Sequence, residues 1–98
     1  MRELSGADLL KLRADSSVPP ALLLDVREPW EFALAAIHID GWRTLNLPLN
    51  SVPEHLAELD PAQPVVCICH HGARSAQVVA FLERQGFEAV YNLSLIHI

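Results

Sequence analysis

The sequence has no apolar run near the ~20 residues that a membrane-spanning helix needs, and no membrane partner is expected. Its start has neither the long apolar stretch nor the cleavage-site pattern of a secretory signal, which makes the cytoplasm the expected compartment. Positive charge is also scarce, because seven Lys and Arg against twelve Asp and Glu give a formal net charge of −5. Binding to a phosphate backbone depends on Lys and Arg. Nucleic acid is therefore not an expected partner.

Cysteine is scarce too: the chain has two, Cys67 and Cys69, separated by one residue. If both lie on one extended strand, we expect their side chains on opposite faces and no disulfide between them. The crowding of these cysteines with His70 and His71 within five residues lacks the paired spacing of a zinc site, and the sequence holds no second pair of ligands. The sequence thus predicts no metal or other cofactor. Thiol chemistry and simple burial remain as roles for the cysteines.

What the sequence does contain is an alternation of strand and helix patterns over 98 residues, a length that suits one domain. Apolar runs bounded by turn residues predict strands, and capped or amphipathic stretches predict helices, with Trp30 and Phe32 expected in the core. Strands are expected at 22–26, 44–47, 65–69 and 89–91, and helices after Ser5, from Pro29, at 53–59 and at 75–85. This alternation predicts an α/β fold, with a parallel central sheet flanked by helices on both faces.

The segment from Cys69 to Ser75 carries the chemistry. Cys69 ends the strongest predicted strand, a loop with one glycine (Gly72) follows, and then a helix begins. Such a loop turns backbone N–H groups toward an anion, the helix N-terminus adds partial positive charge, and Arg74 adds a full charge. These features favour a nucleophilic thiolate at Cys69 inside an oxyanion cradle, against the alternative of a buried, inert cysteine. Asp25 ends a second buried strand, and we expect it to face the same crevice.

Three segments in register resemble the rhodanese-like sulfurtransferases: residues 65–75, residues 85–93, and residues 23–32, which contain an Asp-Val-Arg sequence and a downstream Glu-Phe. The resemblance implies a parallel α/β sheet and catalytic roles for Cys69 and Arg74. Cys69 would take the outer sulfur of a small donor, thiosulfate or a protein persulfide, and pass it from a persulfide to a thiol or cyanide. The substrate-binding cradle would consist of His70, His71, Gly72, Ala73 and Ser75.

The side chains around the loop are expected to have supporting roles. Asp25 and Arg27 are expected to form a structural pair that anchors the pocket wall, and His70 and His71 to shape the rim rather than transfer protons. Two other functions stay open: a non-catalytic rhodanese-like binding or regulatory module, which often lacks the cysteine, and a phosphatase or arsenate reductase of the same fold class. The six-residue loop from 69 to 74 favours sulfur donors, because the related dual-specificity phosphatases carry one residue more.

Two stretches depart from the family pattern. Residues 35–43 fit the family's Gly-rich turn only loosely, with Gly41 as the one candidate glycine. After Leu93 the family continues with a Gly-Gly turn and usually a further helix, whereas this chain ends with residues 94–98. The last six residues, Leu-Ser-Leu-Ile-His-Ile, also match one reading frame of a common sequencing adapter. We therefore hypothesise that residues 93–98 are not native sequence, and expect the single domain, residues 1–98, to be incomplete at its C-terminal end.

Overall fold

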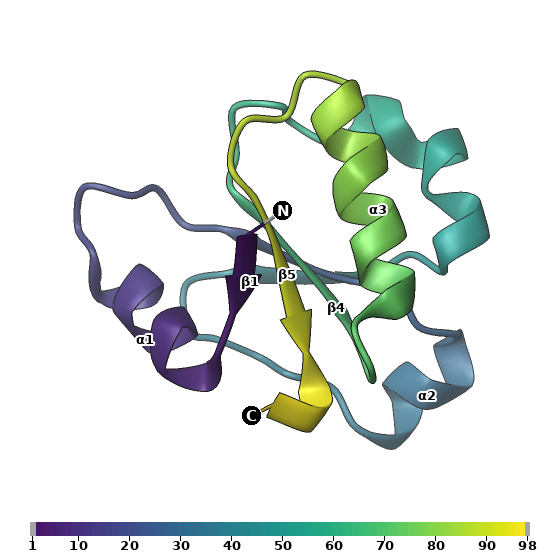
Figure 1. The fold of residues 1–98 in the computed structure, drawn as a ribbon, viewed down its shortest axis with the longest axis horizontal. Helices are drawn as coiled ribbons and strands as arrows, with labels where there is room; N and C mark the ends of the chain where they lie inside the picture. The colour runs from purple at the N-terminus through teal and green to yellow at the C-terminus, as the bar shows by residue number, and fades with distance from the viewer. Residues whose placement is uncertain (1, 98) are drawn as a thin grey trace.

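Five parallel strands form the centre of the protein. The computed structural model describes residues 2–97, and the strands lie in the order β1-β5-β4-β2-β3 (Figure 1). The strands are β1 (Arg2–Leu4), β2 (Leu22–Asp25), β3 (Arg43–Asn46), β4 (Val65–Cys69) and β5 (Val90–Ser94). Parallel neighbours need crossover connections, usually helical. The α/β fold predicted from the alternating pattern is confirmed.

Helices cover both faces of this sheet. The helices are α1 (Gly6–Ala14), α2 (Pro29–Leu34), α3 (Ala73–Arg84) and the short 3₁₀ helices η1 (Leu49–Ser51), η2 (Pro53–Glu58) and η3 (Leu95–His97). The core on one face lies under α3 and the η1–η2 segment, and the core on the other face lies under α1. α2 lies at the end of the sheet where β4 runs into α3 (Figure 1). Within residues 2–97, no helix combines the length and apolar character that crossing a bilayer requires.

The two cores follow from the alternation of side chains along each strand. In β4, Val65, Cys67 and Cys69 pack in the core on the α3 side, while Val66 and Ile68 pack on the α1 side. The expectation that the two cysteines point to opposite faces is therefore wrong, because residues two apart on a strand share a face. Both are free thiols. Burial, and to a smaller extent the neighbouring Cys69, raises the pKa of the Cys67 thiol.

The N-terminal strand β1 is a feature that the sequence analysis does not predict, since three residues are too few for a recognisable alternation. It pairs in parallel with β5 and places Glu3 opposite Asn92. The cap of the helix that follows agrees with the prediction of a start at Ser5. The Ser5 hydroxyl accepts the Asp8 N–H at 3.1 Å, and the Asp8 carboxylate accepts the Ser5 N–H at 3.0 Å. This reciprocal pair is a capping box.

Three helical segments differ from their predictions. α2 has no buried residue, and Trp30 is 66% exposed, so the expectation that Trp30 lies in the core is wrong. Its six residues are too few to lay a broad apolar face on the sheet, and the helix is held instead by polar contacts described below. The helix expected at 53–59 is the 3₁₀ helix η2. α3 begins at Ala73, two residues before the predicted start.

The segment that begins at residue 93 continues the sheet. Leu93 and Ser94 are buried at the end of β5. The Ser94 hydroxyl donates to the His70 carbonyl oxygen at 2.9 Å, and the Ile96 N–H donates to the same oxygen at 3.1 Å. Residue 98 lies outside the described residues. The hypothesis that residues 93–98 are not native stays a prediction, which sequencing of the native locus checks.

Candidate active site

Cys69 ends β4 with its side chain almost fully buried. Its sulfur accepts hydrogen bonds from two backbone N–H groups, that of Gly72 at 3.0 Å and that of Ser75 at 3.3 Å. The Ser75 hydroxyl oxygen lies 3.1 Å from the same sulfur, and either atom can be the donor. Donors placed in this way stabilise a thiolate. The strand end, the loop and the first turn of α3 thus meet at one sulfur atom.

Gly72 gives the loop the turn that this arrangement needs. Its φ of 93° lies in the left-handed region, where glycine is the residue that folds without strain. A Cβ atom at this position would lie 3.5 Å from the Ser94 Cβ, which is an ordinary contact. The backbone conformation, rather than a lack of space, is therefore what favours glycine where α3 begins.

Most of the loop's backbone donors face no protein acceptor. Within residues 2–97, no acceptor is found for the backbone N–H groups of His70, His71, Ala73 and Arg74. The side chains of His70 and His71 are exposed and meet edge to face, with ring centroids 4.5 Å apart. N–H groups left open at a tight loop and a helix start are the groups that bind anions in proteins. Four backbone N–H groups of the described loop thus remain available to a ligand.

α2 supplies the partner of Arg74. The two terminal nitrogens of its guanidinium donate to the two carboxylate oxygens of Glu31 at 2.6 and 2.9 Å. These hydrogen bonds lower the pKa of Glu31 to about 2 and raise the pKa of Arg74. The bidentate pair fixes the orientation of the guanidinium. The sequence analysis does not assign Glu31 to the site, and its one signal is its place in the Glu-Phe of the family-like segment.

Replacing Glu31 with glutamine should change stability in a pH-dependent way. The folded-state pKa of Glu31 lies below its ordinary value of 4.5, so the ionised pair stabilises the fold fully above pH 4.5 and loses this effect as the pH falls toward 2. The pair is partly exposed, so we expect at most about 1 kcal/mol. Urea unfolding of both proteins at pH 7 and pH 3 measures the difference. The exposed Glu83 has no ion pair within residues 2–97, so a Glu83→Gln control should show no such trend.

Asp25 and Arg27 form a buried ion pair, as the sequence analysis expects of this carboxylate and guanidinium. The Arg27 Nε and Nη2 atoms donate to the Asp25 carboxylate, the shortest of these contacts being 2.7 Å. Arg27 also donates to the Ala35 carbonyl oxygen at 2.6 Å and so ties down the end of α2. The hydrogen bonds to the Asp25 carboxylate raise the pKa of Arg27. In the described part of the chain, every donor to the Asp25 carboxylate belongs to Arg27, and none belongs to the Cys69 loop.

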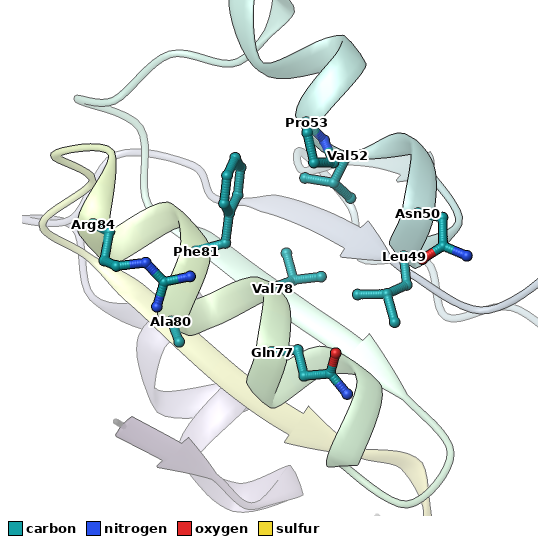
Figure 2. Close-up of a pocket in the computed structure, with 9 residues that line it drawn as sticks. All are labelled: Leu49, Asn50, Val52, Pro53, Gln77, Val78, Ala80, Phe81 and Arg84. Atoms are coloured by element: carbon teal, nitrogen blue, oxygen red, sulfur yellow. The ribbon is translucent and has the colours of Figure 1, made fainter.

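A hollow of about 400 Å³ borders the site, and Arg74 forms part of its wall. Its other lining residues are Val26, Glu28, Pro48, Leu49, Asn50, Ser51 and Glu54. A second hollow, of about 440 Å³, lies between α3 and the 3₁₀ helices (Figure 2) and is mainly apolar, with Arg84 on α3 at its edge. Neither Cys69 nor Arg74 lines this second hollow. Of these two hollows, the first alone is lined by a residue of the Cys69–Ser75 segment, Arg74, and Cys69 lines neither.

Two buried polar residues of β5 complete the site, and the sequence analysis does not identify either. Asn92 contacts the Ser75 hydroxyl and donates to the Gly72 carbonyl oxygen at 3.2 Å. Ser94 donates to the His70 carbonyl oxygen. Polar residues in an apolar strand are the signal that could have found them, because a buried polar group needs a hydrogen-bonding partner.

A family model and the curated relatives of this chain all come from one group of proteins. The model of the rhodanese-like domain matches residues 5–95. The thiosulfate sulfurtransferase GlpE of Stutzerimonas stutzeri is 38% identical over 73 residues, which cover 74% of this chain and 63% of that protein. A sulfurtransferase of Allochromatium vinosum is 34% identical over 93 residues, which cover 95% of this chain and 81% of that protein.

A solved structure agrees with these matches. A rhodanese-like domain protein from Staphylococcus aureus superposes with a TM-score of 0.76 at 26% identity, over 96% of this chain and 85% of that one. The sequence match covers nearly the whole chain, and the fold agrees with it. This protein belongs to the family of rhodanese-like domains.

Proposed function

We propose that the protein transfers a sulfane sulfur from a thiosulfate-like donor to a thiophilic acceptor through a persulfide on Cys69. The observation that carries this proposal is the convergence of two backbone N–H donors on the buried Cys69 sulfur, at the base of a loop with four further open donors. The names of the two curated relatives, a thiosulfate sulfurtransferase and a sulfurtransferase, support the same class of reaction.

In the first half-reaction, the Cys69 thiolate attacks the outer sulfur of thiosulfate. The sulfur–sulfur bond of the donor breaks, and sulfite leaves with the bonding electron pair. Cys69 keeps the transferred sulfur as a persulfide, whose terminal sulfur carries negative charge. The open N–H groups of the loop stabilise that charge, and Arg74, oriented by Glu31, attracts the anionic donor.

In the second half-reaction, cyanide or a thiolate attacks the terminal sulfur of the persulfide. The persulfide bond breaks, the Cys69 sulfur leaves as a thiolate, and the product is thiocyanate or a new persulfide. Atoms and electrons balance across the two half-reactions with donor and acceptor alone. The Asp25–Arg27 pair supports this chemistry indirectly, because it anchors the strand end and α2 beside the loop.

Phosphate ester hydrolysis by the same loop is disfavoured. A phosphoryl group attacked in line needs all its equatorial oxygens seated by donors, and a leaving oxygen needs an acid to protonate it. The loop between Cys69 and Arg74 holds two histidines, a glycine and an alanine, and no carboxylic acid.

Incubation with thiosulfate, followed by mass measurement of the intact protein and its peptides, tests the proposal. We expect a gain of one sulfur atom on Cys69, its loss on addition of cyanide with release of thiocyanate, and negligible hydrolysis of an aryl phosphate. Turnover of the aryl phosphate through Cys69 without any sulfur uptake would mean that the protein is a phosphatase. A protein that performs neither reaction, although folded, would fit a binding module.

A further inference from the structure

Ser75 has more acceptors around its hydroxyl than it can serve. The oxygen contacts the Asn92 side-chain oxygen, the Gly72 carbonyl oxygen at 3.2 Å and the Cys69 sulfur at 3.1 Å. A serine hydroxyl carries one proton. The direction of that proton decides whether Ser75 donates a hydrogen bond to the Cys69 sulfur or accepts one from it.

The orientation of the Asn92 amide settles this direction when Cys69 is a thiol. The Asn92 Nδ2 atom donates to the Gly72 carbonyl oxygen at 3.2 Å and to the Glu3 carboxylate at 3.3 Å. Both of these oxygens only accept, so the NH₂ end of the amide must face them and the oxygen end must face Ser75. An amide oxygen cannot donate. The Ser75 hydroxyl is therefore the donor to Asn92, and its lone pairs face Cys69.

A thiolate at Cys69 requires the opposite arrangement. The thiol form can donate its S–H to the Ser75 oxygen, but the thiolate can only accept. A hydrogen bond to a charged sulfur is stronger than one to a neutral amide oxygen, so the thiolate draws the Ser75 proton away from Asn92. Asn92 and the thiolate thus compete for one proton within a buried cluster.

We propose that Asn92 is a positioning residue that competes with the Cys69 thiolate for the hydroxyl proton of Ser75 and thereby sets how reactive the nucleophile is. The inference rests on the proposed role of Cys69 as the nucleophile. Its consequence is kinetic. A thiolate that is less stabilised by hydrogen bonds is less abundant at neutral pH but attacks sulfur faster, because nucleophilicity falls as the parent thiol becomes more acidic.

Other charged and titratable groups around the site lie on the strands, the helices and the loop that surround Cys69. They are Cys67 of β4, Arg74 of α3, Glu31 of α2 and Glu28 at its N-cap, Glu3 of β1, and His70 and His71 of the loop. All of them are retained when Asn92 or Ser75 is changed. Asn92→Leu also removes the donor to the Glu3 carboxylate, and the same change made in a Ser75→Ala background separates that effect from the effect on the Ser75 hydroxyl.

The test is the rate of Cys69 alkylation by iodoacetamide between pH 5 and 10, read at the Cys69 peptide by mass. Relative to the unmodified protein, Asn92→Leu should move the midpoint of this profile about half a unit to one unit lower in pH, because the thiolate then competes for the Ser75 proton with the neutral Gly72 carbonyl oxygen and no longer with Asn92. Its plateau at high pH should fall about twofold to threefold. In a Ser75→Ala background, the same Asn92→Leu change should leave the midpoint where it is.

A merely structural role for Asn92 predicts a different result. A midpoint that stays in place or rises in Asn92→Leu would overturn the proposal, and so would an equal shift in the Ser75→Ala background. If Asn92→Leu does not fold, Asn92→Ala removes the same acceptor and should give the same shift. Tyr91→Phe removes a hydrogen bond to Arg2 from the same pair of strands, and should leave the profile unchanged.

Alkylation also separates this inference from the proposed function, because it needs no sulfur donor. If the unmodified protein takes up no sulfur from thiosulfate, the proposed function fails while the alkylation profiles still decide the role of Asn92. If sulfur uptake occurs but Asn92→Leu leaves the profile unchanged, the role of Asn92 alone is wrong.

Discussion

Cys69→Ser is expected to lower sulfur transfer from thiosulfate to cyanide on the order of 10³-fold or more, because a serine hydroxyl cannot form the persulfide. The fold should persist, since the hydroxyl can accept the Gly72 and Ser75 N–H groups that now bind the sulfur. Thiocyanate formation measures the activity, and a thermal melt monitored by circular dichroism checks the fold.

Cys67→Ser is the matched control, because Cys67 lies on the same strand and the same face as Cys69 but, within residues 2–97, its sulfur makes no hydrogen bond to the loop. Burial raises the pKa of its thiol, which keeps it protonated and unreactive. We expect this variant to retain activity within about threefold and to lose about 1–3 kcal/mol of stability from a newly buried hydroxyl. Equal loss of activity from both serine variants, with both folded, would contradict the assignment of the nucleophile to Cys69.

Asp25→Ala is expected to cause the largest loss of stability. It leaves the Arg27 guanidinium buried without its counter-charge, and breaking a buried pair in this way costs about 3–5 kcal/mol. A small domain has only about 5–15 kcal/mol in total, so much of the protein would be unfolded at modest urea concentrations. Urea unfolding at pH 7, followed by circular dichroism, measures the free energy of unfolding.

Two further variants separate the buried charge from the lost contact. The double variant Asp25→Ala, Arg27→Met removes both charges and should be more stable than Asp25→Ala alone, because no unpaired charge stays buried. Glu31→Ala opens the partly exposed pair with Arg74 and should cost about 1 kcal/mol or less. A double variant that is no more stable than the single one would show that the pair's shape, rather than its charge, holds this part of the fold.

The segment from Cys69 to Ser75 and the strand before it are local in sequence, which is why the sequence alone predicts a strand, a turn and a helix start there. An unbroken apolar run predicts the buried strand β4 over 65–69, and the structure gives the same bounds. The Ser5 cap is equally local, since its partner lies three residues away. Such features depend on backbone conformation and neighbouring side chains, so the local sequence pattern is enough to predict them.

The partners of the loop, by contrast, depend on tertiary structure. Glu31 meets Arg74 across 43 residues, and Ser75 meets Asn92 across 17, because the strand order brings α2 and β5 to the two sides of the loop. The exposure of Trp30 likewise follows from how α2 sits against the rest of the fold. The sequence by itself determined the strand, the turn and the nucleophile candidate, since these use local backbone rules. Only the tertiary structure decided which distant side chains orient that candidate, because non-local contacts are chosen by how the strands pair.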